Sequence, residues 1–328
     1  MAAMPATLEE RSAQYHAWLE TAPFARGTGR LEGHVVGGRS FRPGRYLLLA
    51  AAACPESHQA LIVHKLKRLD GIVPVVLANT ELTANGWTFP DGSPLPTPSL
   101  NDLYDRSMGA EGPYRGLMTL PALYDSQLKK IVNNHPVLIL NMLARDFDFL
   151  LDDEARRASC ADLCPRSMPM QCEAMLARLN RDVLSAIYAA GFAVNQDVYD
   201  RRVAELFQHL EQLEQALSKS RFLLGPDLTL PDIALFTILL RFELVYYSLF
   251  KCNLRPLSFF PKLTDLAKHV YQTEGVPGTV DCDVIKAHYY RSFASMNPSM
   301  VVAAGPDMAW LEAPCAATQL EHSPRRLD

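Results

Sequence analysis

The pattern of hydrophobic and polar positions changes along the chain. In its first part, short apolar runs predict strands over 46–53 and 72–77, and the segment 56–69 between them predicts an amphipathic helix. That helix places its apolar residues largely toward one side: Ala60, Leu61, Val63, Leu66 and Leu69. Residues 78–118 contain many Gly, Pro, Asn and Asp with little periodicity, which predicts a long irregular excursion.

Two more short strands and a helix complete this part of the chain. Residues 119–125 predict a strand that carries a proline, which ordinary central strands exclude. Ile131-Val132 begins another brief strand, and 136–143 predicts a helix. The order strand, helix, strand, strand, strand, helix is that of a thioredoxin-like fold, built around one βαβ unit and one hairpin.

The rest of the chain has a helical pattern. Residues 198–219 carry apolar side chains at the spacing of an amphipathic helix. Thr229-Leu230-Pro231-Asp232 predicts a capping box before an apolar run over 233–240, which we expect at the centre of a second domain. We therefore predict an α/β plus all-α protein with an N-terminal extension (1–44), a thioredoxin-like domain (45–150), a connection (151–172), an all-helical domain (173–306) and a disordered tail (307–328).

Composition and charge exclude several classes of protein. A chain of 328 residues suits two domains, and 48% hydrophobic with 21% charged residues is typical of a soluble globular protein. The net charge of -4 gives no general attraction to nucleic acid or anionic membranes. The longest apolar stretches are shorter than the roughly 20 residues that span a bilayer. The N-terminus predicts neither a secretory signal nor a transit peptide, and seven scattered cysteines predict no disulfide framework, so we expect a cytoplasmic protein.

Two motifs are too weak to predict a site. Cys160, Cys164 and Cys172 have the spacing C-x3-C-x7-C with no fourth ligand nearby, so we predict no metal site. Gly27-Thr28-Gly29 with Gly33 follows no strand, and it predicts a loop rather than a dinucleotide site.

The junction between the first strand and the first helix carries Cys54-Pro55-Glu56-Ser57. A cysteine at a helix start lies beside unpaired backbone N–H groups and the positive end of the helix dipole. Both favour the thiolate, which is the nucleophilic form. Pro55 fits the first helical position. A buried structural cysteine is the alternative, but the Cys-Pro pair at this junction favours a nucleophile.

A thioredoxin-like half with Cys-Pro at its first helix, followed by a helical half with a T-x-x-D box, resembles a glutathione transferase. Further blocks are similar to the glutathionyl-hydroquinone reductases, the Xi class of that superfamily, over roughly residues 41–306. These blocks occur in the family's order: Gly86-Trp87-Thr88-Phe89, Ile131-Val132-Asn133-Asn134, Ala190-Gly191-Phe192-Ala193, Arg241-Phe242-Glu243, Phe250-Lys251-Cys252-Asn253, His288-Tyr289-Tyr290-Arg291-Ser292 and Asn297-Pro298.

The resemblance implies a reaction at Cys54. This cysteine attacks the sulfur of a glutathionyl-hydroquinone, hydroquinone leaves, and a mixed disulfide with glutathione remains. A second glutathione resolves it, because Ser57 stands where a C-x-x-C motif has its second cysteine. Glutathione is thus the implied co-substrate and a quinone-type compound the implied acceptor.

The resemblance also implies the binding residues. Pro121 matches a cis-proline, and the backbone of Leu120 beside it pairs with glutathione. The residues implied in glutathione binding are Trp87, Leu120, Pro121, Asn134 and His135, and those lining the acceptor pocket are Tyr188 and Tyr289. Core packing is the alternative for each aromatic residue. The family forms homodimers through its C-terminal helices, so Tyr246, Tyr247 and Phe250 lie either near such a contact or in the core.

The sequence departs from the family at the glutathione site. Cys-Pro-Trp-Ala-His is replaced by a motif with Glu56 and Ser57, the Glu-Ser anchor at a helix start is replaced by His135-Pro136, and a basic residue is replaced by Leu117. Pro136 offers neither hydroxyl nor N–H to a carboxylate. Losing two charge-assisted bonds of about 1.5–3 kcal/mol each weakens binding by roughly a hundredfold or more. Glu56 opposes a thiolate at Cys54 and repels an anionic tripeptide. A protonated His58 would offset this charge, but a histidine that packs against the helix is the favoured interpretation.

Three functions follow. The first is a glutathione-dependent reductase of the Xi type with altered thiol affinity. The second keeps the chemistry of Cys54 but uses another thiol or acceptor. The third is a non-catalytic protein that binds a ligand or partner through the transferase fold. The retained Cys54, Pro121 and Trp87 favour catalysis, and the changed anchor favours its loss.

Overall fold

A four-stranded sheet forms the centre of the first half. The computed structural model describes residues 30–35, 42–83, 86–151 and 161–315. The strands are β1 (Tyr46–Ala50), β2 (Val75–Leu77), β3 (Ala122–Asp125) and β4 (Lys130–Asn133), in the order β2-β1-β3-β4. β1 and β2 are parallel, and the other two pairs are antiparallel. The predicted thioredoxin-like fold is confirmed, with one more helix, α3 (Leu100–Met108), between β2 and β3 than the predicted order has.

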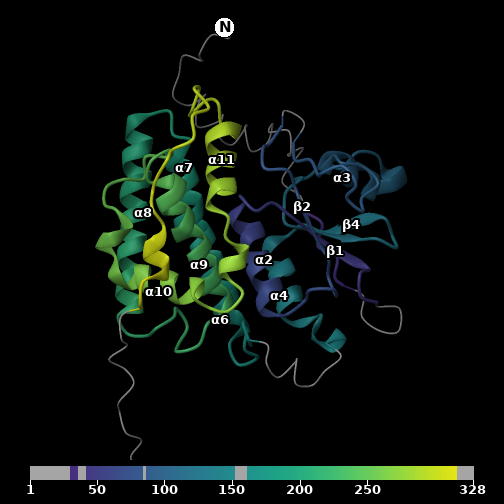
Figure 1. Cartoon of the computed structure of the whole chain (residues 1–328), viewed down its shortest axis with the longest axis horizontal. Helices are drawn as coiled ribbons and strands as arrows, with labels where there is room; N and C mark the ends of the chain where they lie inside the picture. Colours follow the sequence, from purple (N-terminus) through teal and green to yellow (C-terminus); the bar gives the residue numbers. More distant parts are fainter. Residues whose placement is uncertain (1–29, 36–41, 84–85, 152–160, 316–328) are drawn as a thin grey trace, which may run out of the picture.

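Strand β1 is apolar throughout because both of its faces are covered. Leu48 and Ala50 belong to the core shared with α2 (Pro55–Leu66) and α4 (Pro136–Arg145). Leu47 and Leu49 point to the opposite face and belong to a second core, shared with α3 (Leu100–Met108). Alternate residues of a strand point to opposite faces, so a strand covered on both sides reads as a continuous apolar run. Figure 1 shows α2 and α4 on one side of the sheet and α3 on the other.

Helix α3 corrects the prediction for the excursion 78–118, which is not irregular throughout. Leu100, Leu103 and Tyr104 are buried at helical spacing, and the hydroxyl of Ser99 accepts a hydrogen bond from the backbone N–H of Asp102 at 3.3 Å. The Ser-x-x-Asp signature of a helix start was therefore present in the sequence. The short turn Gly109–Glu111 follows.

Helix α2 is buried on more sides than an amphipathic helix. Ser57, His58, Gln59 and His64 are buried together with Ala60 and Val63, while Leu61 and Leu66 are only partly buried. The reason is that α2 packs against α4 on one side and against α9 of the second half on another. The apolar positions of α2 therefore did not predict which of its residues are buried.

The second half consists of helices. They are α6 (Pro169–Arg178), α7 (Ser185–Gly191), α8 (Gln196–Leu217), α9 (Leu230–Arg241), α10 (Pro261–Tyr271) and α11 (Cys282–Ser292). Shorter turns are Asp148–Leu150, Leu257–Phe259, Pro277–Thr279 and Ala309–Glu312, and π-helical turns are Leu179–Leu184 and Phe242–Tyr246. Every residue of α9 is buried, and the Asp232 carboxylate accepts from the Thr229 N–H at 2.9 Å, as the predicted central helix and capping box require.

Two predicted irregular segments contain structure. Helix α6 begins at Pro169, inside the predicted connection 151–172, because Cys172 and Leu176 pack into the core. The predicted disorder of 307–328 is wrong for its first part, since Leu311 is 1% exposed and its carbonyl accepts from the Gln272 amide at 2.8 Å. Residues 316–328, like 1–29, 36–41 and 152–160, lie outside the described residues.

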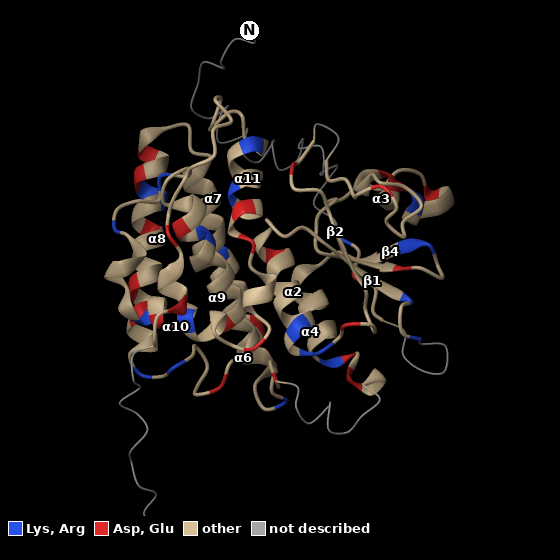
Figure 2. Ribbon diagram, in the orientation of Figure 1, with Lys and Arg blue, Asp and Glu red and all other residues tan. Residues whose placement is uncertain are grey.

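The two halves meet along α2, α9 and α11. The Gln59 amide of α2 donates to the Thr237 hydroxyl of α9 at 3.3 Å. The Ser292 hydroxyl at the end of α11 accepts from the backbone N–H of Leu82 at 3.1 Å, so the excursion after β2 is bound to the second half. Figure 2 shows charged residues along α8 and α10, away from this interface. Within the described residues, no helix is long and apolar enough to cross a membrane.

Candidate active site

Cys54 is the N-cap of α2, as predicted. Its sulfur accepts a hydrogen bond from the Ser57 N–H, with the two atoms 3.5 Å apart. The thiol donates to the Leu120 carbonyl, also at 3.5 Å. Pro55 is the first residue of the helix, a position whose backbone N–H has no partner within the helix, so that a proline fits there. The residue is partly exposed.

The thiol form is favoured at Cys54, which corrects the predicted preference for thiolate. Burial of the sulfur raises the pKa of Cys54, and the negative charge of Glu56 raises it further. The Ser57 N–H and the positive charge of Arg241 lower the pKa, but the first two effects outweigh them. The predicted opposition of Glu56 to the thiolate is thus confirmed.

The peptide bond between Leu120 and Pro121 is cis, as predicted. This cis bond directly precedes β3. Leu120 is buried, and its carbonyl accepts the hydrogen bond from the Cys54 thiol. This places the reactive sulfur beside the backbone edge that begins at Leu120.

Trp87 lies where the two halves meet. Its indole stacks on the His288 ring of α11, with ring centroids 4.9 Å apart and planes 13° apart. His288 Nδ1 is 2.8 Å from the Thr80 carbonyl. Burial lowers the pKa of His288 to about 4, so the stacked imidazole is neutral at pH 7. A neutral ring packs on Trp87 without bringing charge to the site.

Three tyrosine hydroxyls form a connected group in the second half. The Tyr188 and Tyr289 hydroxyls are 2.7 Å apart, and the Tyr246 and Tyr289 hydroxyls are 3.3 Å apart. Burial raises the pKa of all three, so they remain protonated and can donate hydrogen bonds. The charge of a Cys54 thiolate would raise the pKa of Tyr188 and Tyr289, which lie near it. Of the three residues with two alternatives, Tyr246 and Phe250 are in the core, and Tyr247 is partly buried against it.

Arg241 is a buried cation that the site prediction missed. Its guanidinium donates to the carbonyls of Ala53 at 2.8 Å and Ala52 at 2.9 Å, immediately before Cys54. It also donates to the Thr237 carbonyl at 3.0 Å. The sequence indicated this residue by placing an arginine directly after the apolar run 233–240. Burying a charge there costs free energy unless strong hydrogen-bond partners compensate it.

His58 does not offset Glu56. It is fully buried, and its Nδ1 accepts from the Arg241 guanidinium at 3.2 Å while Nε2 lies 3.1 Å from the Thr279 hydroxyl. Burial and the charge of Arg241 lower the pKa of His58 well below its usual range. The packing interpretation of this histidine is therefore correct, and the protonated one is wrong.

The start of α4 is the predicted glutathione anchor. Pro136 is the first helical residue and His135 is the N-cap, but its side chain makes no capping bond. Among the described residues, the buried His135 Nδ1 has no hydrogen-bond partner. The Asn134 side chain is fully buried, accepts from the Leu31 N–H at 2.7 Å and donates to the Leu117 carbonyl at 2.5 Å. Asn134 therefore fixes the backbone of this anchor with its side-chain amide.

Glu56 contacts the second half. Its carboxylate accepts from the Asn180 amide at 3.3 Å, where Asn180 lies in the π-helical turn after α6. Burial raises the pKa of Glu56, and the positive charge of Arg30 opposes that shift. Glu56 and Arg30 are thus close enough to influence each other.

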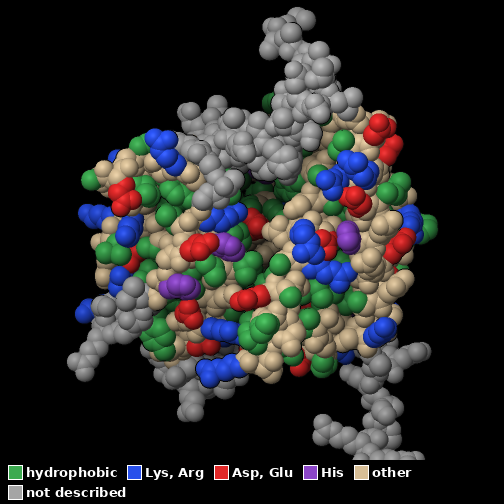
Figure 3. All heavy atoms as spheres, turned by 180° about the vertical axis from the view of Figure 1, so that it is seen from behind, with side chains coloured by type: hydrophobic (Ala, Val, Ile, Leu, Met, Phe, Trp, Pro, Cys, Tyr) green, Lys and Arg blue, Asp and Glu red, His purple; other side chains and the backbone are tan. Residues whose placement is uncertain are grey.

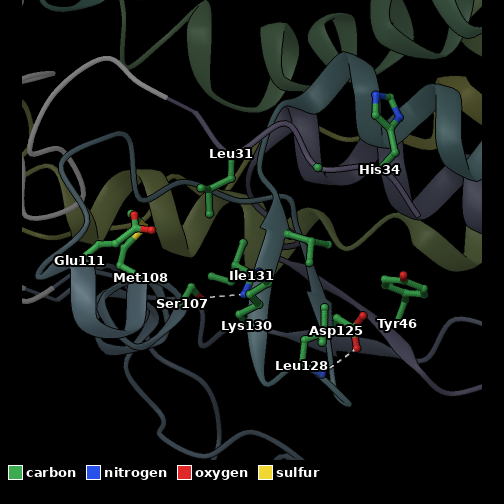
Figure 4. A pocket seen from close by; sticks show the side chains of 12 residues that line it. Leu31, His34, Tyr46, Ser107, Met108, Glu111, Asp125, Leu128, Lys130 and Ile131 are labelled. Carbon is green, nitrogen blue, oxygen red and sulfur yellow. Dashed lines mark hydrogen bonds between the residues drawn. The ribbon is translucent and has the colours of Figure 1, made fainter. Parts of the chain in front are cut away.

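A hollow and a separate pocket are visible on the surface. Figure 3 shows a hollow between the two halves, with hydrophobic side chains in its depth. The pocket in Figure 4, of about 390 Å³, lies instead at the outer edge of the sheet along β4. Its lining includes Tyr46, Ser107 and Asp125 but none of the predicted site residues.

The comparisons with known proteins agree with this geometry. Residues 196–268 match the model of the glutathione S-transferase C-terminal domain. The glutathionyl-hydroquinone reductase PcpF of Sphingobium chlorophenolicum is 34% identical over 297 residues, which cover 88% of this chain and 93% of PcpF. The chain belongs to the glutathionyl-hydroquinone reductases.

Solved structures place this reductase family in the transferase fold. The glutathione-bound structure of YqjG from Escherichia coli K-12 superposes with a TM-score of 0.77 at 33% identity, covering 86% of this chain and 91% of YqjG. A Xi class transferase from Natrialba magadii gives a TM-score of 0.80 at 32% identity, covering 89% of each chain. The expected fold and class are confirmed.

Proposed function

We propose that this reductase removes glutathione from glutathionyl-hydroquinones, with Cys54 as nucleophile and glutathione as co-substrate. The observation that carries the proposal is the Cys54 sulfur at the start of α2, 3.5 Å from the Leu120 carbonyl and beside cis-Pro121. Relatives bearing this activity in their name cover most of the chain, and one transferase homologue was solved with glutathione bound.

The reaction has two steps. In the first, the Cys54 thiolate attacks the sulfur of the glutathionyl group, the carbon–sulfur bond breaks, and the hydroquinone ring carbon takes up a proton. Cys54 is oxidised to a mixed disulfide while the hydroquinone carbon is reduced. In the second, a glutathione thiolate attacks the glutathione sulfur of this disulfide, which releases glutathione disulfide and restores the Cys54 thiolate.

The surrounding residues would bind the two substrates. We propose that Leu120 and Pro121 pair with the glutathione backbone, and that Trp87 and His135 contact it. The protonated hydroxyls of Tyr188 and Tyr289 would donate to the oxygens of the hydroquinone. Asn134 would act by fixing the anchor, since its side chain is bonded within the protein.

Several properties of the whole protein belong to this proposal. It would be cytoplasmic, without nucleic acid or membrane partners and without a metal, which the net charge of -4 and the scattered cysteines support. It would be a homodimer, with a thioredoxin-like domain over 45–150 and a helical domain over 173–306. Light scattering coupled to size exclusion would measure the oligomeric state, and a monomer at micromolar concentration would contradict the dimer.

The test is a turnover assay. The purified protein is mixed with a glutathionyl-hydroquinone and millimolar glutathione, and formation of glutathione disulfide is followed. We expect turnover that the Cys54→Ser variant abolishes. A rate equal to that of the serine variant would contradict the proposal.

One observation favours a second function, a thiol transferase that uses another thiol or acceptor. Pro136 is the first residue of α4, so the anchor lacks the serine hydroxyl and N–H that the family offers to a carboxylate. Intact mass after treatment with oxidised glutathione, and with other small disulfides, would identify the thiol that Cys54 accepts. A glutathione adduct alone would rule this alternative out, and a protein that forms no adduct with any of them would be a non-catalytic member.

A further inference from the structure

We infer that Arg30, from the segment preceding the sheet, binds a carboxylate of the glutathione tripeptide in place of the anchor residues that this chain lacks. The inference rests on the proposed function and assigns one residue of its specificity. Arg30 is half-buried and contacts Asn134, shortly before α4, and Thr119, shortly before β3.

The backbone around Arg30 is held in a defined place. Residues 31–33 run along the edge strand β4, with the Gly33 N–H donating to the Val132 carbonyl at 2.9 Å and the Asn134 N–H donating to the Leu31 carbonyl at 2.9 Å. A Cβ at Gly33 would lie 2.7 Å from the Val132 oxygen, so only glycine permits this approach. The segment carrying Arg30 is therefore an added strand-like edge rather than a loose arm.

The guanidinium of Arg30 spans the two backbone segments that a bound peptide would contact. Its Nη1 donates to the Asn134 carbonyl at 2.7 Å and to the Thr119 hydroxyl at 3.2 Å. Thr119 immediately precedes Leu120, whose carbonyl faces the Cys54 sulfur. In glutathione each carboxylate is one residue away from the cysteine, and one residue of extended chain spans about 3.3–3.6 Å. Because Thr119 is the neighbour of Leu120, a tripeptide paired with the Leu120 backbone would direct one of its carboxylates toward Arg30.

The charges at this point call for an anion. The positive end of the α4 dipole and the Arg30 guanidinium lie together, and a cation at a helix N-terminus is unfavourable unless an anion compensates it. His135 adds no charge, because burial and Arg30 lower its pKa. The Arg30 side chain hydrogen-bonds to neutral oxygens in the structure, which leaves charge-assisted donors for a carboxylate.

Two carboxylates of the protein lie near the Arg30 guanidinium and could compete with a ligand carboxylate for it. The positive charge of Arg30 partly offsets the burial that raises the pKa of Glu56, and the negative charge of Glu32 partly offsets the burial that lowers the pKa of the nearby His135. Neither forms an ion pair with Arg30 in the structure. A ligand carboxylate would therefore add an ionic contact that Arg30 does not make with either of these two residues.

The test compares binding of three thioethers that cannot form a mixed disulfide. S-methylglutathione carries both carboxylates, S-methylcysteinylglycine lacks the glutamyl end, and γ-glutamyl-S-methylcysteine lacks the glycyl end. Calorimetry on the full chain measures each ligand with the wild type, Arg30→Gln and Arg30→Lys. We expect Arg30→Gln to weaken the binding of S-methylglutathione about ten- to a hundredfold, and Arg30→Lys to weaken it less. The truncated ligand that lacks the carboxylate bound by Arg30 should bind the wild type and Arg30→Gln equally.

The control is Arg202→Gln, which removes an exposed arginine of α8. Equal binding of S-methylglutathione by the wild type and Arg30→Gln would overturn the inference. An equal loss for all three ligands would also overturn it, because it would show that Arg30 only supports the fold. If the wild type binds S-methylglutathione and is active in the turnover assay but Arg30→Gln binds the ligand equally well, the proposed function stands without this inference. If the wild type neither binds S-methylglutathione nor shows turnover, both the proposed function and the inference fail.

Discussion

At the scale of single residues, the reactivity of Cys54 is a balance between opposing charges. Glu56 opposes the thiolate, and the buried guanidinium of Arg241 favours it. A buried charge is strongly felt because the surrounding medium screens it weakly. Neither residue hydrogen-bonds to the Cys54 sulfur, whose partners are the Leu120 carbonyl and the Ser57 N–H, so both act on the ionisation of the thiol through their charge.

Replacing Glu56 by Gln should make Cys54 more reactive at neutral pH. The change removes a negative charge that raises the thiol pKa, so the pH profile of alkylation by iodoacetamide shifts toward lower pH. For the wild type, we expect the rate to go on rising with pH beyond about 8.5, where an ordinary thiol levels off, because the folded pKa is above the usual value. Identical profiles for the two proteins would contradict the role of Glu56.

Replacing Arg241 should have the opposite effect. Arg241→Met removes the positive charge, raises the thiol pKa, and leaves the carbonyls of Ala52 and Ala53 without donors, at about 1–3 kcal/mol for each buried group. Arg241→Lys keeps a charge but not the planar fork, so we expect an intermediate profile. The measurements are the same alkylation profile and urea unfolding, with Arg202→Gln as the matched control. A loss of stability with an unchanged profile would show a purely structural role.

At the scale of elements, the start of α4 shows how a helix keeps its form while its ligand site changes. Proline at the first helical position is favourable for the helix, whereas an N–H and a hydroxyl there would serve an anion. Restoring His135→Glu together with Pro136→Ser should therefore strengthen glutathione binding by roughly a hundredfold, if two charge-assisted bonds return. Calorimetric titration measures this. Unchanged affinity would mean that the anchor lies elsewhere.

The elements also show what the sequence could predict. The apolar runs of β1 and α9 identified the sheet and the central helix because both are buried on all sides. Helix α3 was missed because only three of its residues face the core, within a segment rich in turn residues. Strand β2 is shorter than predicted, since Ile72 and Val73 form turn bonds to the Leu69 carbonyl after α2.

The candidate site was predictable only where a local motif or the family resemblance marked it. Cys54 and cis-Pro121 were found in this way. Arg241 and Arg30 were not, because Arg241 contacts the Ala53 carbonyl across 188 residues of sequence and Arg30 contacts the Asn134 carbonyl across 104. The direction of the Cys54 pKa was wrong because burial of the sulfur and the charge of Glu56 together outweigh the local effect of the helix start.

At the scale of the whole molecule, stability should fall in acid through a buried ion pair. Arg45 and Asp125 are 2.7 Å apart, with side chains 7% and 1% exposed. Burial alone would raise the pKa of Asp125, but bonds from Arg45 and from the N–H groups of Leu128 and Gln127 hold it below its usual value. The stabilisation is thus present above about pH 4 and is lost as pH falls through the lower folded pKa.

Urea unfolding between pH 7 and pH 2 checks this expectation. The free energy of unfolding of the wild type should decline below about pH 4. Asp125→Asn should be less stable at pH 7, because Arg45 then lacks its carboxylate, and should show a shallower decline in acid. Parallel pH dependences for the two proteins would contradict the assignment.

The bonds from Arg241 to the carbonyls before Cys54 also bear on how such a protein evolves. The sulfur belongs to one half of the chain, and the charge that tunes it belongs to the other. A recombination event that joined this thioredoxin-like half to an unrelated helical partner would separate the nucleophile from its tuning charge. Selection on the chemistry therefore acts on both halves as one inherited unit, although each has the layered architecture of a separate module.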